Sequence, residues 1–133
     1  MRTELYLALV RAGLGESVDV AGARHLTSTD WSWITASARR HRLGNLLFAG
    51  IRQSGLEREI PGAVFQSLES TYYTNLAHTF FLFEHAQSII KRTRKARRGG
   101  APMLLLKGAS FAGWLYPSPA LRPMGDLDIM VQG

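Results

Sequence analysis

The stretch that decides the fold is Met103–Val131, MLLLKGASFAGWLYPSPALRPMGDLDIMV. Its first four residues are apolar, which is typical of a short buried strand. The small residues Gly108-Ala109-Ser110 follow, and then a helix-like segment over residues 111–115. The stretch closes with two aspartates and three apolar residues, which indicates a second strand. It therefore predicts a strand, a turn, a helix and another strand.

Asp126 and Asp128 are the residues of this stretch with the clearest chemical meaning. On a strand, side chains two residues apart point to the same face, so the two carboxylates are expected to project together while Leu127 points into a core. Two like charges this close repel each other. Mg²⁺ would relieve the repulsion, because it prefers carboxylate oxygen and keeps positions open for phosphate and water. The alternative is a solvated strand edge that carries two acids by chance.

The turn at Lys107-Gly108-Ala109-Ser110 has the composition of a phosphate-binding turn. Small residues let backbone N–H groups approach a phosphate, and the N-terminus of the following helix favours an anion. Such turns are common, so this one alone is a weak signal. A phosphate-friendly turn that is followed by paired carboxylates is a much stronger one.

Together these residues resemble the nucleotidyltransferases with a palm domain of the DNA polymerase beta type. The motifs that carry the resemblance are LLKG (residues 105–108), a Tyr-Pro turn (116–117) and RPMGDLDIMV (122–131). They are most similar to a bacterial branch in which a helical N-terminal region precedes the palm, and the similarity extends upstream to about residue 30. The sequence departs from the wider superfamily at Ala109, where Gly or Ser is usual, and in the longer spacing to Asp126.

The resemblance implies an enzyme of the nucleotidyltransferase class. Such an enzyme transfers a nucleoside monophosphate from a nucleoside triphosphate, most simply ATP, to an acceptor and releases pyrophosphate. Asp126 and Asp128 would be the catalytic residues and would bind Mg²⁺, or Mn²⁺ in its place. The metal would neutralise the triphosphate and lower the pKa of the attacking hydroxyl.

The resemblance also assigns phosphate-binding roles within the turn. Gly108, Ala109 and Ser110 would hold phosphates through backbone amides and the Ser110 hydroxyl. Lys107 and Arg122 would clamp the phosphates with their positive charges. Each has an alternative role, Lys107 in solvating the end of the strand and Arg122 as the ion-pair partner of the first aspartate.

A complete palm has more strands than residues 99–133 can supply, and it also has a third carboxylate. Two strands with one helix do not make an independently stable sheet. We therefore expect a missing C-terminal segment or a partner chain to complete the palm. The activity of this enzyme class is therefore an expectation for the completed palm and not for this chain by itself.

Composition indicates an ordinary globular protein of 133 residues, with 46% hydrophobic and 20% charged residues. The absence of cysteine excludes disulfides and thiolate metal sites and favours a cytoplasmic location. No apolar run is long enough for a signal peptide or a membrane span, so no membrane partner is expected. The net charge of +6 favours anionic partners without distinguishing nucleotides from nucleic acid.

Residues 1–98 read as a helical N-terminal region and residues 99–133 as a partial palm, which makes the fold α+β. Helices are expected over residues 3–12, 31–42 and 43–53, with helix caps offered by residues 28–30. A long helix should run from Pro61 to about Arg98. Its aromatic residues recur every three or four positions and are expected in a core, including Phe80 and Phe81.

The basic run at residues 91–98, KRTRKARR, has two explanations. Cations are favoured near the C-terminus of a helix, so a solvated helix end is the simpler one. The other is a patch that attracts a polyanion such as RNA, which would make the chain a non-catalytic module that binds nucleic acid or a protein. A third, weaker hypothesis is an antitoxin-like nucleotidyltransferase that modifies a partner protein.

Overall fold

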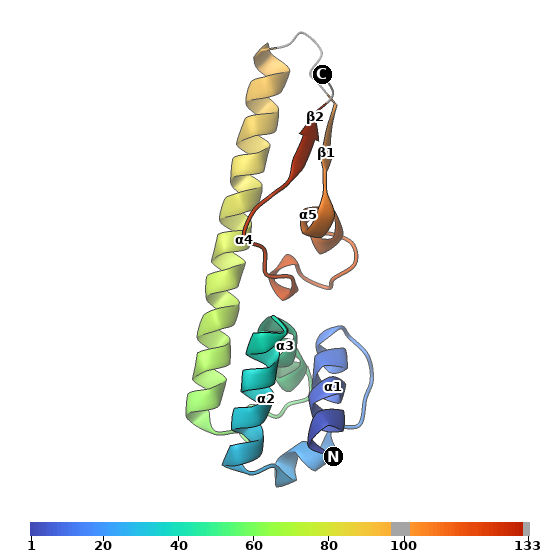
Figure 1. Cartoon of the computed structure of the whole chain (residues 1–133), viewed down its shortest axis with the longest axis vertical. Helices are drawn as coiled ribbons and strands as arrows, with labels where there is room; N and C mark the ends of the chain where they lie inside the picture. Colours follow the sequence, from blue (N-terminus) through green and yellow to red (C-terminus); the bar gives the residue numbers. More distant parts are fainter. Residues whose placement is uncertain (97–101, 132–133) are drawn as a thin grey trace. The chain divides into compact units, whose positions relative to one another are not determined.

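The computed structural model describes residues 1–96 and 102–131 of the chain. Helices dominate, and the two short strands form one antiparallel sheet, so the expected α+β class is confirmed (Figure 1). The elements in chain order are α1 (Arg2–Gly13), η1 (Ala21–His25), α2 (Ser28–Arg40), α3 (Gly44–Gln53), α4 (Gly62–Ala96), β1 (Met103–Leu105), α5 (Lys107–Ala112), η2 (Pro119–Leu121) and β2 (Ile129–Val131).

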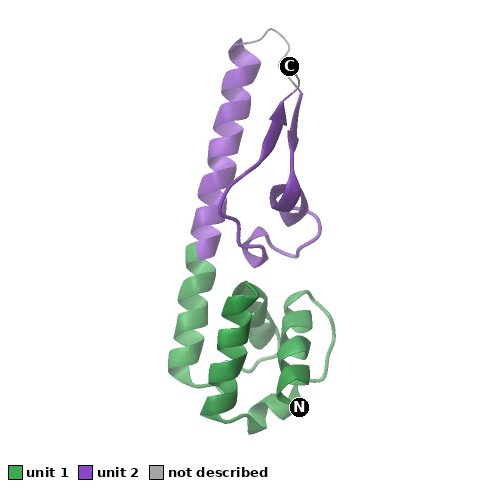
Figure 2. Cartoon of the chain, viewed as in Figure 1, with its two compact units in different colours: residues 1–74 green, residues 75–133 purple. Residues whose placement is uncertain are grey.

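The chain forms two compact units, residues 1–74 and residues 75–133 (Figure 2). Helix α4 contributes its first part to one unit and the rest to the other. The boundary predicted after residue 98, between a helical region and a partial palm, falls among residues outside the described ranges and stays a prediction.

The first unit is organised around the packing of α1 on α3. Two glycines let these helix backbones approach closely: a β-carbon at Gly13 would lie 2.1 Å from the Leu46 carbonyl oxygen, and one at Gly50 would lie 1.8 Å from that of Leu9. The largest fully buried side chains of this unit surround the contact. They are Trp31, Phe48, Leu9, Ile34, Leu47, Ile51 and Asn45.

Helix α2 begins with a capping box that fixes its first turn. Thr27 is the N-cap, one residue before the positions expected, and its side chain accepts a hydrogen bond from Asp30 N at 3.2 Å. The Asp30 carboxylate in turn accepts from Thr27 N at 3.0 Å. Two backbone donors that the helix leaves without partners are satisfied in this way.

Helix α4 confirms the long helix that periodicity predicted. Residues 97 and 98, which the prediction also included, lie outside the described ranges. In the first unit its aromatic face packs as expected, with Phe48 of α3 at 5.5 Å from Phe65 and 4.9 Å from Tyr72 between ring centroids. The expectation was wrong for Phe80 and Phe81, which are 59% and 55% exposed, and in the first unit for Tyr73, which is 49% exposed. The buried positions of this part of α4 include small residues instead, Thr79 and Ala86.

The second unit contains a strand–helix–strand, as the sequence predicted, but the helix lies earlier than expected. Residues 107–110, predicted as a turn, form the start of α5, and the helix predicted over residues 111–115 ends at Ala112. Strands β1 and β2 pair antiparallel, with Met103 opposite Val131 and Leu105 opposite Ile129. Between them α5 packs its buried Ala109 and Ala112 beside η2, where Ala120 is also buried. Among the described residues, no helix is both long and apolar enough to cross a membrane.

Candidate functional site

The two aspartates of the predicted metal site precede β2 and do not lie on it. We expected them on the strand, but β2 begins at Ile129. The reason is the length of its partner: β1 ends at Leu105, and the chain enters α5 at Lys107. The last hydrogen bond between the two segments runs from Leu106 N to Asp128 O at 2.9 Å, so no ladder extends as far as Asp126.

Lys107 stands at the junction of β1 and α5 in an unusual backbone conformation. Its φ is +52°, a region that residues with a β-carbon enter at a cost of about 1–2 kcal/mol. Leu106 before it is extended, so the chain reverses direction sharply between the two residues. Ser110 stabilises the first turn of α5 by donating its hydroxyl hydrogen to Lys107 O at 2.7 Å.

The side chain of Lys107 reaches Asp128. Its ammonium Nζ lies 2.6 Å from Asp128 Oδ2, although the lysine side chain is 78% exposed and the aspartate 39%. The hydrogen bond to this carboxylate, and then its charge, raise the pKa of Lys107, and the charge of Asp126 adds to the effect. Both carboxylates of the pair therefore act on one cationic group.

Arg122 lies against the turn on which Gly108 sits. A β-carbon at Gly108 would be 3.3 Å from Arg122 Nε and 3.5 Å from Nη2, so the missing side chain makes room for the guanidinium. Within residues 1–96 and 102–131, Arg122 forms no ion pair, and Asp126 forms none either. The alternative role of Arg122, as ion-pair partner of Asp126, is therefore not seen.

The site thus brings together most of the residues that the sequence singled out. Lys107 forms an ion pair with Asp128, and Arg122 lies against Gly108 of the predicted phosphate-binding turn. Ala109 is buried and can offer only its backbone. Sequence reasoning missed the pairing of Lys107 with Asp128, because the pairing depends on the antiparallel register of β1 and β2, which no local pattern of residues predicts.

The donor set suits a hard divalent cation. The Asp128 carboxylate pairs with the Lys107 ammonium, Asp126 lies two residues earlier in the chain, and both acids are accessible to solvent. Oxygen ligands of this kind are those that Mg²⁺ prefers. Over the described part of the chain there is no cluster of three or more histidine, aspartate or glutamate side chains, so the third carboxylate that the resemblance implies is not among them.

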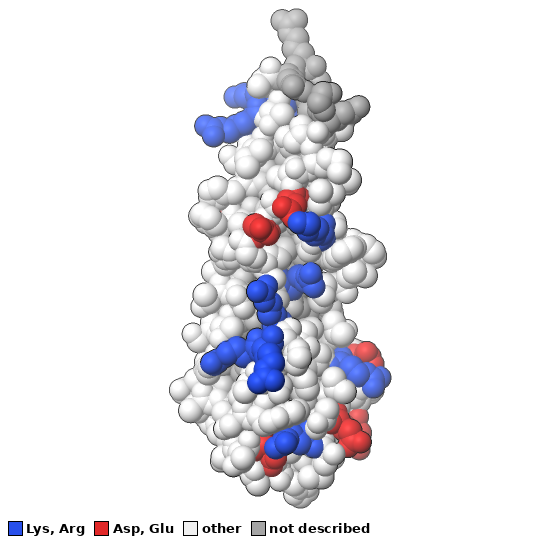
Figure 3. Space-filling model, in the orientation of Figure 1, with Lys and Arg blue, Asp and Glu red and all other residues white. Residues whose placement is uncertain are grey.

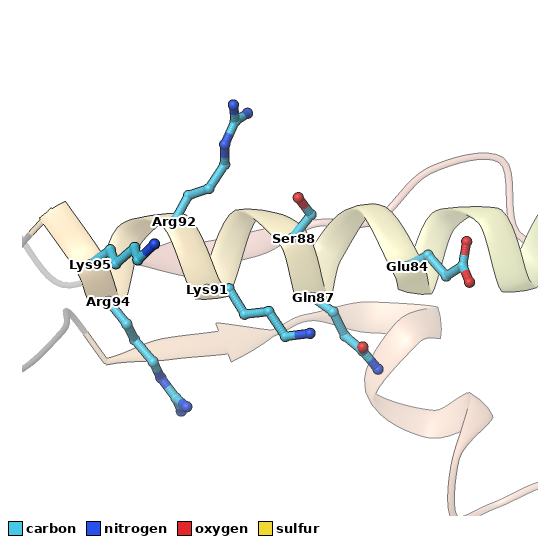
Figure 4. A pocket seen from close by; sticks show the side chains of 7 residues that line it. All are labelled: Glu84, Gln87, Ser88, Lys91, Arg92, Arg94 and Lys95. Atoms are coloured by element: carbon cyan, nitrogen blue, oxygen red, sulfur yellow. The ribbon is translucent and has the colours of Figure 1, made fainter.

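A second feature of this unit is a basic hollow on α4. Lysine and arginine side chains outnumber acidic ones on the face of the chain in view in Figure 3, in keeping with the net charge of +6. The hollow has a volume of about 810 Å³, and its lining side chains project in several directions from the helix (Figure 4). They are Glu84, Gln87, Ser88, Lys91, Arg92, Arg94 and Lys95.

The second unit thus holds a short strand–helix–strand in which Asp128 pairs with Lys107, the residue next to Gly108. The model of a family described as uncharacterised nucleotidyltransferases matches residues 27–133. The chain therefore belongs to this nucleotidyltransferase family. No curated protein and no solved structure matches it.

Proposed function

We propose that this protein transfers a nucleoside monophosphate from ATP to an acceptor, with Mg²⁺ held by Asp126 and Asp128. The observation that carries the proposal is the pairing of Asp128 with a cation next to Gly108, with the exposed Asp126 two residues earlier, in a member of a nucleotidyltransferase family. When bound, Mg²⁺ would neutralise the triphosphate and lower the pKa of the attacking hydroxyl. Mn²⁺ would serve in its place.

The reaction has a simple balance. An oxygen of the acceptor forms a bond to the α-phosphorus, and the bond from that phosphorus to the bridging oxygen breaks. Pyrophosphate leaves with the electron pair, and the acceptor hydroxyl loses its proton to solvent. The protein's contribution is therefore to position the triphosphate and to offset its charge, which is the principal task in transfers at phosphorus.

The residues of the turn have distinct parts in this positioning. Gly108 leaves space for the Arg122 guanidinium, a planar group whose N–H donors match phosphate oxygens in pairs. The Ser110 hydroxyl donates its hydrogen to Lys107 O, so to bind a phosphate oxygen, as the resemblance implies, it would have to give up that hydrogen bond. Backbone N–H groups of residues 108–110 would contact phosphate, as the family resemblance implies. A third carboxylate, from outside the described residues, would complete the site.

The test is to replace each aspartate by asparagine in the full-length protein. Asp126→Asn and Asp128→Asn should each abolish transfer of label from [α-³²P]ATP to acceptors in a cell extract, and should weaken Mg²⁺-dependent ATP binding. The fold should persist, because an exposed ion pair such as that of Asp128 contributes at most about 1 kcal/mol. Glu84→Gln, an exposed acid on α4, is the matched control and should leave transfer unchanged. Unchanged turnover in either aspartate variant would refute the assignment.

A second candidate function is a non-catalytic module that binds nucleic acid through α4. It is favoured by the basic hollow, whose four cationic residues at 91, 92, 94 and 95 have Glu84 as the only acid among the lining residues described. Of the run predicted from the sequence, residues 97 and 98 lie outside the described ranges. This hypothesis requires steeply salt-dependent binding of RNA, since such binding is driven by the release of counterions.

A further inference from the structure

The ion pair between Lys107 and Asp128 occupies the place that the proposed function gives to the metal. Lys107 Nζ lies 2.6 Å from Asp128 Oδ2, a short separation typical of a charge-assisted hydrogen bond. Lysine is suited to this role, because its ammonium is a compact point charge on a flexible stem. It therefore behaves as a built-in cation for the carboxylate pair.

The backbone at the start of the Lys107 side chain is held in position independently of the ion pair. Leu106 N donates to Asp128 O at 2.9 Å, so the residue before Lys107 is joined to the residue that Lys107 contacts. The left-handed φ of +52° at Lys107 is a conformation of raised energy that the surrounding structure maintains. The arrangement is thus set by the strand junction, and the exposed side chain can leave without unfolding it.

We propose that the Lys107 ammonium and a divalent cation exclude one another at Asp128, so that metal binding releases Lys107 toward the triphosphate. This inference rests on the proposed function, whose metal site it shares. In the metal-free protein, the lysine offsets the repulsion between the two carboxylates. When a doubly charged cation replaces it, the lysine loses its partner and becomes available for a phosphate oxygen.

The exchange couples the two ligands of the site. A metal ion that binds alone must first displace the lysine, which lowers its affinity. A metal ion that arrives with a triphosphate gives the displaced lysine a new anionic partner, so the two ligands favour each other's binding. Because such coupling is reciprocal, ATP should raise the affinity for metal by the same factor as metal raises the affinity for ATP.

The experiment measures Mn²⁺ binding to the full-length protein through the electron paramagnetic resonance signal of free Mn²⁺, without ATP and without any turnover. Lys107→Met removes the competing charge on an unchanged backbone, and we expect it to bind Mn²⁺ about two- to five-fold more tightly, the range of an exposed ion pair. Lys107→Arg retains a positive charge and should stay near wild type. Arg40→Met, which removes an exposed charge in the other unit, is the control and should not change the affinity.

With ATP present, the order of the Mn²⁺ affinities should reverse, and wild type should bind Mn²⁺ more tightly than Lys107→Met. Lys107→Met should lose most of the mutual enhancement between Mn²⁺ and ATP, which the wild-type protein should show. If Lys107→Met and wild type bind Mn²⁺ equally, the exchange is overturned while the metal site stands. If neither binds Mn²⁺, or if Asp128→Asn binds it as well as wild type does, both the exchange and the proposed function fail.

Discussion

Replacement of Gly50 by alanine tests whether the first unit depends on the backbone contact between α1 and α3. The added β-carbon would lie 1.8 Å from Leu9 O, 2.8 Å from the Leu9 carbonyl carbon and 3.1 Å from Gly13 N. Favourable contacts between such atoms need about 3.5 Å. All three atoms belong to the backbone of α1, so no side chain can rotate away, and the two helices must separate.

The expected loss of stability follows from two opposed effects. Overpacking of this kind costs about 1–3 kcal/mol, and a clash with backbone belongs at the upper end of that range. Alanine returns about 1 kcal/mol through its higher helix propensity. The free energy of unfolding should therefore fall by about 2 kcal/mol, which is a large part of the 5–15 kcal/mol typical of a domain.

Urea denaturation followed by circular dichroism at 222 nm measures this change. Gly44→Ala is the matched control, because it lies on the same helix and a β-carbon there meets nothing within 4 Å. Its unfolding free energy should stay within about 0.5 kcal/mol of wild type. If Gly50→Ala proves as stable as Gly44→Ala, the close approach of α1 and α3 is not what organises this unit.

Two further outcomes are expected. The hydrogen bonds of the capping box lower the pKa of Asp30, and the one from the Thr27 side chain has the largest effect. The ionised Asp30 therefore stabilises the fold above its unfolded pKa of about 3.9, and this contribution is lost as pH falls through the pKa of Asp30 in the folded state. Asp30→Asn should accordingly lose less stability than wild type between pH 6 and pH 3 in urea titrations. If α4 binds RNA, replacing Arg92 and Arg94 by Gln should reduce the slope of log affinity against log salt by up to about 2, and an unchanged slope would argue against that surface.

Local signals in the sequence predicted the helices from α1 to α4 well, but they placed α5 about four residues too late. The span of α4 followed from its periodicity and from Pro61, and Asp30 was expected to help begin α2, where it forms the capping box. These features depend on residues only a few positions apart, so they are readable without knowledge of the fold. The resemblance to nucleotidyltransferases rested on motifs of the same local kind, and the family match confirmed it at the level of the family.

Features that depend on distant contacts could not be predicted. The exposure of Phe80 and Phe81 depends on how little of the chain packs on that face of α4, and periodicity carries no such information. The contact of Lys107 with Asp128 depends on an antiparallel register between segments more than twenty residues apart. The roles of the site residues in metal and phosphate binding likewise stay predictions.

The two candidate functions can be separated by one substitution, Asp126→Asn. Asp126 carries a negative charge within the unit that also carries the basic hollow. If the chain only attracts polyanions, Asp126→Asn removes a repulsive charge, and binding of RNA should strengthen slightly or stay the same. If the carboxylate holds a metal against a triphosphate, the same substitution removes an oxygen ligand, and Mg²⁺-dependent ATP binding should weaken. Loss of Mg²⁺-dependent ATP binding on Asp126→Asn therefore favours the enzyme, whereas RNA binding that is kept or strengthened, with no such loss, favours the binding module.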